Sequence, residues 1–355
     1  MTRCLLLFTL LLAAPAFGQM TAGDYLADLD EGTRIVERYY SGYRYKVTER
    51  TAASYQAVKD SVRALVAEGA APFEDAFGRY LAWFKDYHLH DLCGAQDKYM
   101  DGPVDYAARM EYAPKDVFRQ VDANTFLIRH SSCVWSGRRM RWIRKAVRAF
   151  RKSGCDNLIL DLRGNGGGSD GTSDPFIELL FDHDGFYNGI AIRNTPVSIG
   201  FFRKEMRKDR YWQTHLDACE QSGEEYPVLF EPHRIHYGEV SGRPVRAAVI
   251  IDNRTASSAE QLVLVLRRVS DRVTVFGKDH SLGCLDYANP RGVRLSRSGY
   301  AFRLPLTCTL GLPEAGIDAG GIVPDVIIDC EYPEKLTDNI DAWIPWVAAR
   351  LQENQ

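Results

Sequence analysis

Residues 254–260 read Arg-Thr-Ala-Ser-Ser-Ala-Glu and place two serines side by side. A strand-like apolar run, 247–252, precedes them, and a helix-like run, 261–268, follows. The N-terminus of a helix presents unpaired backbone N–H groups and a partial positive charge. A serine hydroxyl placed there can attack a carbonyl, and the N–H of the next residue can hold the oxyanion that forms. The same segment also fits a plain helix N-cap, with Thr255 or Ser257 as the capping residue.

A glycine-rich loop offers a second chemical feature. Residues 157–169 read NLILDLRGNGGGS, in which an apolar strand-like run ends at Asp161. Glycines let a backbone approach a ligand closely and present several N–H groups together. Three uses fit this loop: a phosphate cradle, a nucleophile elbow at Ser169, or an oxyanion hole for a serine elsewhere. The elbow requires its serine at the strand end, and Ser169 lies well beyond that end. A tight structural turn is the remaining interpretation.

The elements around these motifs change type along the chain. Residues 21–85 show mostly helical spacing of apolar side chains. From about residue 125, short apolar runs such as 158–160 alternate with helix-like runs. This alternation is typical of an α/β layer with a largely parallel sheet. The sequence therefore predicts a helical N-terminal region at 19–85, followed by an α/β domain at 86–355.

The first residues have the composition of a secretory signal peptide. Arg3 precedes an apolar run at 4–14, and a small-x-small site follows at 16–18. The apolar run is too short to span a bilayer, and no later run is long enough to do so. We expect cleavage near Gly18 and a periplasmic or secreted protein without a transmembrane segment.

Charge and cysteine content exclude some classes of function. The formal net charge is −3, and it becomes −4 without residues 1–18, which carry Arg3 and no acidic residue. A mildly acidic chain argues against nucleic-acid binding. The basic run at 138–152 fits an amphipathic helix with a solvated basic face, or else a surface for an anionic partner. Seven of the eight cysteines follow the leader, and none has metal-site spacing, so we expect no metal.

Three segments together resemble the C-terminal processing (tail-specific) protease family, which includes the tricorn core. They read LILDLRGNGGG, RTASSAEQ and GIVPDV, at 158–168, 254–261 and 321–326. Their order and spacing also fit the family, over roughly residues 73–329. The resemblance implies an α/β fold of the ClpP/crotonase-like type, with a mainly parallel sheet. It further implies that 86–355 is the catalytic domain and that no cofactor takes part.

The resemblance assigns roles to the residues of the first two motifs. Ser257 matches the family nucleophile. The oxyanion hole would be formed by the N–H of Ser258 and by that of a glycine, Gly167 or Gly168. Glu260 would buttress the site, or would only complement the helix dipole as a first-turn acid.

The chain departs from the family at the expected base. Many members use a serine–lysine dyad, with the lysine in the loop that occupies 277–287 here. Cys284 stands where that lysine is expected, and Lys278 lies too early in the loop. The segment Lys-Asp-Tyr-His at 85–88 resembles the D-x-H segment of tricorn-like members, so His88 is the expected base. Imidazole titrates near neutral pH and can take up and return the serine proton.

Several residues compete for the supporting roles. By its position relative to the GIVPDV segment, Asp318 matches the acid that orients the imidazole, and Glu314 is its nearby rival. His90 and His280 are the alternative bases.

The sequence and the resemblance together predict an exported serine endopeptidase that hydrolyses polypeptides. No PDZ domain is expected, since only about seventy residues separate His88 from Asp161, and they already hold a strand and a helix. One alternative is a catalytically inactive protein of the same fold that binds peptides or a partner. Another is an esterase that uses Ser169.

Overall fold

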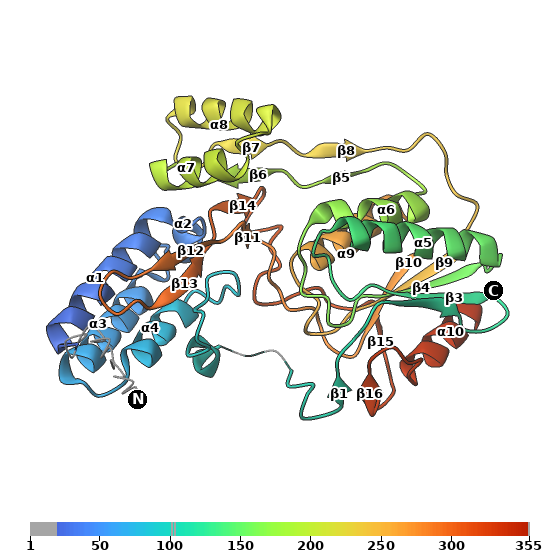
Figure 1. Cartoon of the computed structure of the whole chain (residues 1–355), viewed down its shortest axis with the longest axis horizontal. Coiled ribbons are helices and arrows are strands. Elements are labelled where there is room, and N and C mark those ends of the chain that lie inside the picture. Colours follow the sequence, from blue (N-terminus) through green and yellow to red (C-terminus); the bar gives the residue numbers. More distant parts are fainter. Residues whose placement is uncertain (1–19, 101, 103, 354–355) are drawn as a thin grey trace, which may run out of the picture.

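The computed structural model describes residues 20–100, 102 and 104–353, so the expected signal peptide at 1–18 lies outside the described residues. Figure 1 shows two lobes: a central sheet with its covering helices, and a lobe built on the N-terminal helices. No helix in the part of the chain that the structure describes is long and apolar enough to cross a membrane.

A six-stranded sheet forms the centre of the first lobe, in the order β15-β10-β9-β4-β3-β2. Neighbouring strands are parallel except for β2 and β3, which are antiparallel. The expected mainly parallel α/β sheet is therefore confirmed. The strands are β2 (Val117–Gln120), β3 (Thr125–Arg129), β4 (Asn157–Asp161), β9 (Arg246–Ile250), β10 (Val273–Gly277) and β15 (Val326–Ile327).

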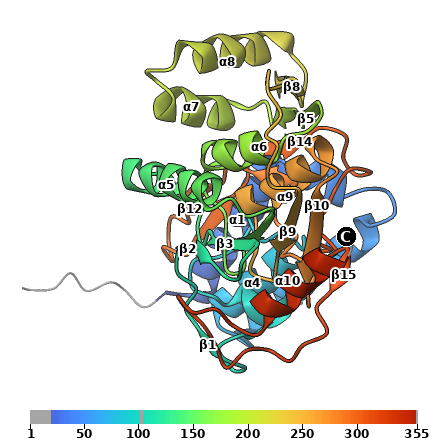
Figure 2. The same cartoon turned by 90° about the vertical axis from the view of Figure 1, so that its right-hand side faces the viewer.

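Helices cover both faces of this sheet. One face carries α5 (Gly137–Ser153), α6 (Asp174–Leu180) and α9 (Ser258–Val269), and the other carries α10 (Trp343–Glu353), as Figures 1 and 2 show. Successive residues of a strand point to opposite faces. Accordingly, Leu158 and Leu160 of β4 pack in the core under α5, α6 and α9, whereas Ile159 packs toward α10. Burial on both faces explains why the sequence of this strand is continuously apolar.

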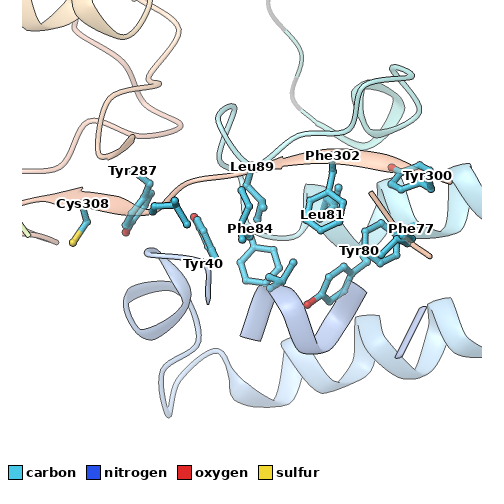
Figure 3. Close-up of a cluster of buried hydrophobic side chains, with 14 of the residues drawn as sticks. Tyr40, Phe77, Tyr80, Leu81, Phe84, Leu89, Tyr287, Tyr300, Phe302 and Cys308 are labelled. Carbon is cyan, nitrogen blue, oxygen red and sulfur yellow. The ribbon is translucent and has the colours of Figure 1, made fainter. Parts of the chain in front are cut away.

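The second lobe packs the N-terminal helices against a hairpin from the C-terminal half. The helices are α1 (Ala22–Tyr39), α2 (Tyr43–Lys46), α3 (Ala52–Glu68) and α4 (Phe73–Ala82), and the hairpin strands are β12 (Arg291–Arg294) and β13 (Ala301–Leu304). The expected helical N-terminal region is thus present. Aromatic side chains fill the interface, with Phe302 of β13 packed over Phe77, and Tyr40 and Phe84 beside them (Figure 3).

Smaller sheets and two helices complete the molecule. The sheet β11-β14-β6-β7 carries α7 and α8 above it (Figure 1), and its strands pack into the core of the second lobe. These elements are β5 (Gly185–Tyr187), β6 (Ile190–Ile192), α7 (Pro196–Glu205), α8 (Arg210–Ser222), β7 (Val228–Phe230), β8 (His233–Ile235), β11 (Tyr287–Ala288) and β14 (Thr307–Thr309). The remaining elements are η1 (Gln96–Tyr99), β1 (Glu111–Tyr112), η2 (Asp170–Thr172) and β16 (Lys335–Leu336), with β1 and β16 paired.

Candidate active site

Ser257 stands in a strained turn directly before α9. Its φ is +55° and its ψ is −123°, a backbone conformation that residues other than glycine rarely adopt. It is partly exposed, whereas Thr255, Ala256 and Ser258 around it are buried. Strain that exposes one hydroxyl at a strand-to-helix turn is a feature of functional serines. Thr255, the other capping candidate, instead donates its hydroxyl to the carbonyl of Leu162 at 3.0 Å.

Glu260 fixes this turn from inside the protein. Its fully buried carboxylate accepts a hydrogen bond from the N–H of Ser257 at 2.8 Å. It also accepts from the hydroxyl of Ser281 at 2.5 Å and from the N–H groups of Gly283 and Cys284 at 2.7 and 2.9 Å. Burial raises the pKa of Glu260, and these hydrogen bonds oppose the rise. Glu260 therefore ties the nucleophile turn to the loop after β10.

The glycine loop lies directly against Ser257. A Cβ on Gly167, whose φ is +89°, would come within 2.7 Å of the carbonyl oxygen of Ala256 and of the Cβ of Ser257. A Cβ on Gly168 would come within 2.4 Å of the carbonyl carbon of Cys133. Only glycine permits this approach, which explains the glycine run in the sequence.

Two backbone N–H groups remain available beside the serine. The N–H of Gly167 donates to Asn165 Oδ1 at 3.1 Å. By contrast, no acceptor among the described residues pairs with the N–H of Gly168 or with that of Ser258. Both residues line the same cavity as Ser257. Of the predicted donors, Gly168 and Ser258 have the N–H groups that can hold an oxyanion, and Gly167 shapes the loop.

A buried ion-pair network anchors the glycine loop to the sheet. Arg163, the second residue after β4, bonds Asp161 through Nε at 2.9 Å and Asp341 through Nη2 at 2.8 Å. Arg129 joins the same two carboxylates from β3. Burial alone raises the pKa of Asp161, but Arg163 and Arg129 outweigh it and lower that pKa. The start of the glycine loop is thus held by two arginines, each of which pairs with both carboxylates.

His88 comes from the second lobe, in the segment after α4. Its backbone N–H donates to Asp86 Oδ1 at 2.8 Å, and its Nδ1 lies 2.6 Å from the carbonyl oxygen of Tyr287. A carbonyl only accepts, so Nδ1 carries a proton, and in the neutral imidazole the lone pair is then on Nε2. This tautomer is the one that a general base needs. The orienting acceptor is therefore a backbone carbonyl of β11.

His88 and Ser257 face one cavity of about 630 Å³ between the two lobes. Gly166, Gly167 and Gly168 line it on the side of Ser257. The side of His88 is lined by residues of the other lobe, among them Leu285, Ala288, Asn289, Arg303 and Thr307. Within the described ranges, no hydrogen bond joins Ser257 directly to His88. Catalytic hydrogen bonds often tighten only when substrate is bound.

Asp318 contacts the backbone next to Tyr287. Its Oδ1 accepts from the N–H groups of Leu285 and Asp286 at 2.9 and 2.7 Å. Asp286 returns the contact by accepting from the N–H of Asp318 at 2.9 Å. Asp318 Oδ2 is buried and has no hydrogen-bond partner among the residues that the structure describes. The two carboxylates thus clasp the segment whose carbonyl orients the imidazole.

The charge state of Asp318 follows from this packing. Burial, followed by the carboxylates of Asp86 and Asp286, raises the pKa of Asp318 well above its usual range. Burial also raises the pKa of Asp286. The buried surroundings therefore favour the protonated form of Asp318. Its rival Glu314 is exposed and does not line the cavity.

The other candidate bases lie elsewhere. Neither His90 nor His280 lines the cavity. Burial, then Arg303, lowers the pKa of His90. Nδ1 of His280 lies 2.5 Å from the carbonyl oxygen of Ser281. Lys278 donates its ammonium to the carbonyl of Cys330 at 2.6 Å.

Cys284 stands at the position of the expected lysine, and Ser169 is the alternative nucleophile. Cys284, at the position of the expected lysine, is buried, and burial followed by nearby carboxylates raises its pKa well above the usual value, so it is a neutral thiol. Ser169 lines the cavity, and its N–H donates to the carbonyl of Cys133 at 2.8 Å.

One group in the described part of the chain has ligand atoms spaced as in a metal site. It consists of Asp182, His183 and Asp271, whose ligand atoms lie within 4.8 Å of one another. None of the three lines the cavity that holds Ser257.

Comparison with known proteins places this geometry in a family. Among solved structures, a putative peptidase from Parabacteroides merdae ATCC 43184 is 17% identical with a TM-score of 0.57, covering 87% of this chain and 90% of that one. Mature CPAF complexed with lactacystin is 9% identical with a TM-score of 0.66, covering 94% of this chain and 99% of that one. A lipoprotein from Streptococcus agalactiae is 13% identical with a TM-score of 0.50, covering 93% and 97%. The TM-scores indicate a shared fold, and at identities this low the likeness shows the fold alone.

None of the curated proteins matches this chain. The family model described as Peptidase family S41 matches residues 127–328, which is more than half of the 355 residues. This stretch includes the glycine loop and the turn of Ser257. The chain therefore belongs to peptidase family S41, and it is a serine-type peptidase.

Proposed function

We propose that the protein is an exported endopeptidase in which Ser257 is the nucleophile and His88 the general base. The observation that carries the proposal is that Ser257, Gly168, Ser258 and His88 all line one cavity. Among the residues that the structure describes, no lysine lines this cavity, so we take the imidazole as the base for the serine.

The reaction follows from the roles of these groups. His88 Nε2 takes the hydroxyl proton as Ser257 Oγ attacks the substrate carbonyl carbon. The N–H groups of Gly168 and Ser258 stabilise the tetrahedral oxyanion. The imidazolium then returns its proton to the leaving amine, and a water activated by the same imidazole hydrolyses the acyl-enzyme.

The support for His88 comes through a carbonyl instead of a carboxylate. Tyr287 accepts from Nδ1 at 2.6 Å and fixes the tautomer. Asp318 holds the backbone of Leu285 and Asp286, and so it positions the strand that carries this carbonyl. We therefore propose Asp318 as a positioning residue that acts through Tyr287.

The decisive experiment measures degradation of an unfolded protein by the purified mature chain and by the Ser257→Ala variant. Ser169→Ala is the matched control, since Ser169 lines the same cavity. Cleavage by wild type and by Ser169→Ala, with none by Ser257→Ala at equal folding, supports the proposal. Loss in Ser169→Ala alone would favour the esterase mechanism.

A peptide-binding protein without catalysis is the second candidate function. The missing direct hydrogen bond between Ser257 and His88, in the described chain, favours it. Absence of cleavage by the wild type over a panel of unfolded proteins, with retained peptide binding, would establish this function instead.

Export rests on residues 1–18. We propose that they act as a signal peptide, and N-terminal sequencing of protein from the culture medium or periplasm tests this. A mature N-terminus near Gln19 is the expected result, and an intact Met1 in the cytoplasm would contradict it.

A further inference from the structure

The active-site cavity contains a cation that no acidic side chain neutralises. Arg303 lines the cavity and is exposed. Among the described residues, neither an ion pair nor a side-chain hydrogen bond engages its guanidinium. Other arginines of the same lobe do find carboxylates: Arg44 pairs with Glu225, and Arg297 with Asp24.

The strand pattern accounts for where Arg303 lies. Phe302 and Leu304 of β13 are buried in the core of the second lobe. Because side chains alternate along a strand, Arg303 is on the opposite face, which borders the cavity. The backbone N–H of Arg303 donates to the carbonyl of His90 at 2.8 Å. This bond joins β13 to the segment that carries His88, two residues before His90.

The wall of the cavity on the side of Ser257 carries an acidic side chain. Asp170 is exposed and lines the cavity beside the turn of Ser257. Desolvation by the surrounding protein raises the pKa of Asp170, and its interaction with the side chain of Ser258 opposes the rise. The cavity thus presents a guanidinium on the His88 side and a carboxyl group on the Ser257 side. An acidic group of a substrate is attracted to the first wall and repelled by the second.

We propose that Arg303 is a specificity-determining residue that binds a carboxylate of the polypeptide substrate. Guanidinium is suited to this because its planar donors match a carboxylate in two parallel hydrogen bonds. The carboxylate comes from an Asp or Glu side chain or from the C-terminus of the substrate. The proposal deepens the proposed function and rests on it only in assuming that the cavity receives peptide.

The test measures peptide binding, so that its result does not depend on catalysis. Fluorescent peptides with amidated C-termini carry Glu, Gln or Lys at one scanned position and bind to the Ser257→Ala protein. In that background, Arg303→Gln and Arg303→Glu are compared with Arg294→Gln. Arg294 is an exposed arginine of the same hairpin, lies outside the cavity lining, and loses the same charge. A further peptide with a free C-terminus and no acidic side chain separates the two sources of carboxylate.

The expected result is a preference for the Glu peptide, or for the free C-terminus, of about tenfold over the Lys peptide. Arg303→Gln abolishes the preference, Arg303→Glu reverses it, and Arg294→Gln leaves it unchanged. Equal binding of all peptides to the unsubstituted cavity overturns the proposal, as does an Arg294→Gln effect as large as that of Arg303→Gln. Loss of cleavage in Ser257→Ala is judged separately, with the wild-type assay.

Discussion

The two walls of the active-site cavity are built in different ways. The wall of Ser257 consists of segments that continue directly from β4 and β9, and the glycine loop and the nucleophile turn contact each other through Gly167. The wall of His88 is assembled from the segment after α4, from β11 and from β13, which are distant in sequence. The first wall is fixed by the sheet, and the second by the aromatic core of Figure 3.

This difference shows which part of the site depends on packing between lobes. The proposed oxyanion donors and the proposed nucleophile follow neighbouring strands of one sheet. The carbonyl of Tyr287 that contacts His88 follows the loop from β10 to β11, whose second half is held by Glu260 at Gly283 and by Asp318 at Leu285. The geometry of the serine is therefore local, whereas that of the histidine is a property of the whole fold.

The largest effect is expected at the base. His88→Ala removes the group that accepts the serine proton, and we expect kcat/KM for an unfolded protein substrate to fall by about 10²–10⁴-fold. His90→Ala is the matched control, because His90 lies two residues away and does not line the cavity. A larger loss in His90→Ala would assign the base to that histidine and would contradict the proposed pairing.

The sheet wall is tested by a pair of glycine substitutions. Gly168→Ala introduces a Cβ within 2.4 Å of the Cys133 carbonyl carbon and moves an oxyanion donor, so we expect an activity loss of about 10²–10³-fold. A Cβ on Gly166 meets nothing within 4 Å, so Gly166→Ala should keep the loop intact. Equal activity of the two variants, measured with a short peptide substrate, would show that the loop does not supply the oxyanion hole.

The contact between the turn of Ser257 and the loop after β10 is tested at Glu260. Glu260→Gln replaces one acceptor oxygen with a donor that faces buried N–H groups, and we expect a loss of about 1–3 kcal/mol in the free energy of unfolding. Glu314→Gln changes the same atoms at an exposed position and should be neutral. Urea denaturation measures both. Equal midpoints for the two variants would mean that Glu260 does not hold the turn.

The smallest effect concerns the charge of Asp318. Its folded-state pKa is raised, so between the unfolded and folded pKa values the folded state binds more protons, and stability falls as pH rises through this window. Asp318→Asn should remove this loss, by up to about 1.4 kcal/mol per pH unit, and should retain most activity. Thermal unfolding at a series of pH values measures it.

The same variant separates two roles for Asp318. An ionised carboxylate that orients the imidazole directly would lose about 10⁴-fold in kcat on conversion to Asn. A protonated residue that clasps the backbone tolerates Asn, because the amide oxygen still accepts from Leu285 and Asp286. Asp318→Ala, which removes the clasp, should lower activity in either case.

The sequence predicted the sheet wall better than the histidine wall. The parallel sheet and the N-terminal helices followed from hydrophobic spacing, and the family followed from three motifs, all confirmed. The motifs can be recognised in the sequence because the residues of each are contiguous. In the first motif the backbone also requires glycine. Strained backbone at Ser257 and tight approach at Gly167 leave a mark on residue type.

The remaining contacts left no such mark. The carbonyl that orients His88 belongs to Tyr287, and every residue has a carbonyl, so no residue type signals this role. The use of Gly167 N–H by Asn165, and the placement of β11 and β13 beside the N-terminal helices, depend on tertiary packing. The assignment of Ser257, His88 and Asp318 to catalysis stays a prediction for the experiments above.

At Cys284 the site has a neutral thiol where a serine–lysine relative has a cation. The thiol at this position is surrounded by Asp86, Asp318, Glu260 and Asp286, and all four raise its pKa. A serine–lysine relative would place an ammonium there, and an ammonium would compensate these carboxylates. In this chain no ammonium stands at this position, and the raised pKa values of Asp318 and Asp286 favour protonation of these two carboxylates. Proton uptake by carboxylates takes the place that a fixed cation would have here, so the charge of this region depends on pH.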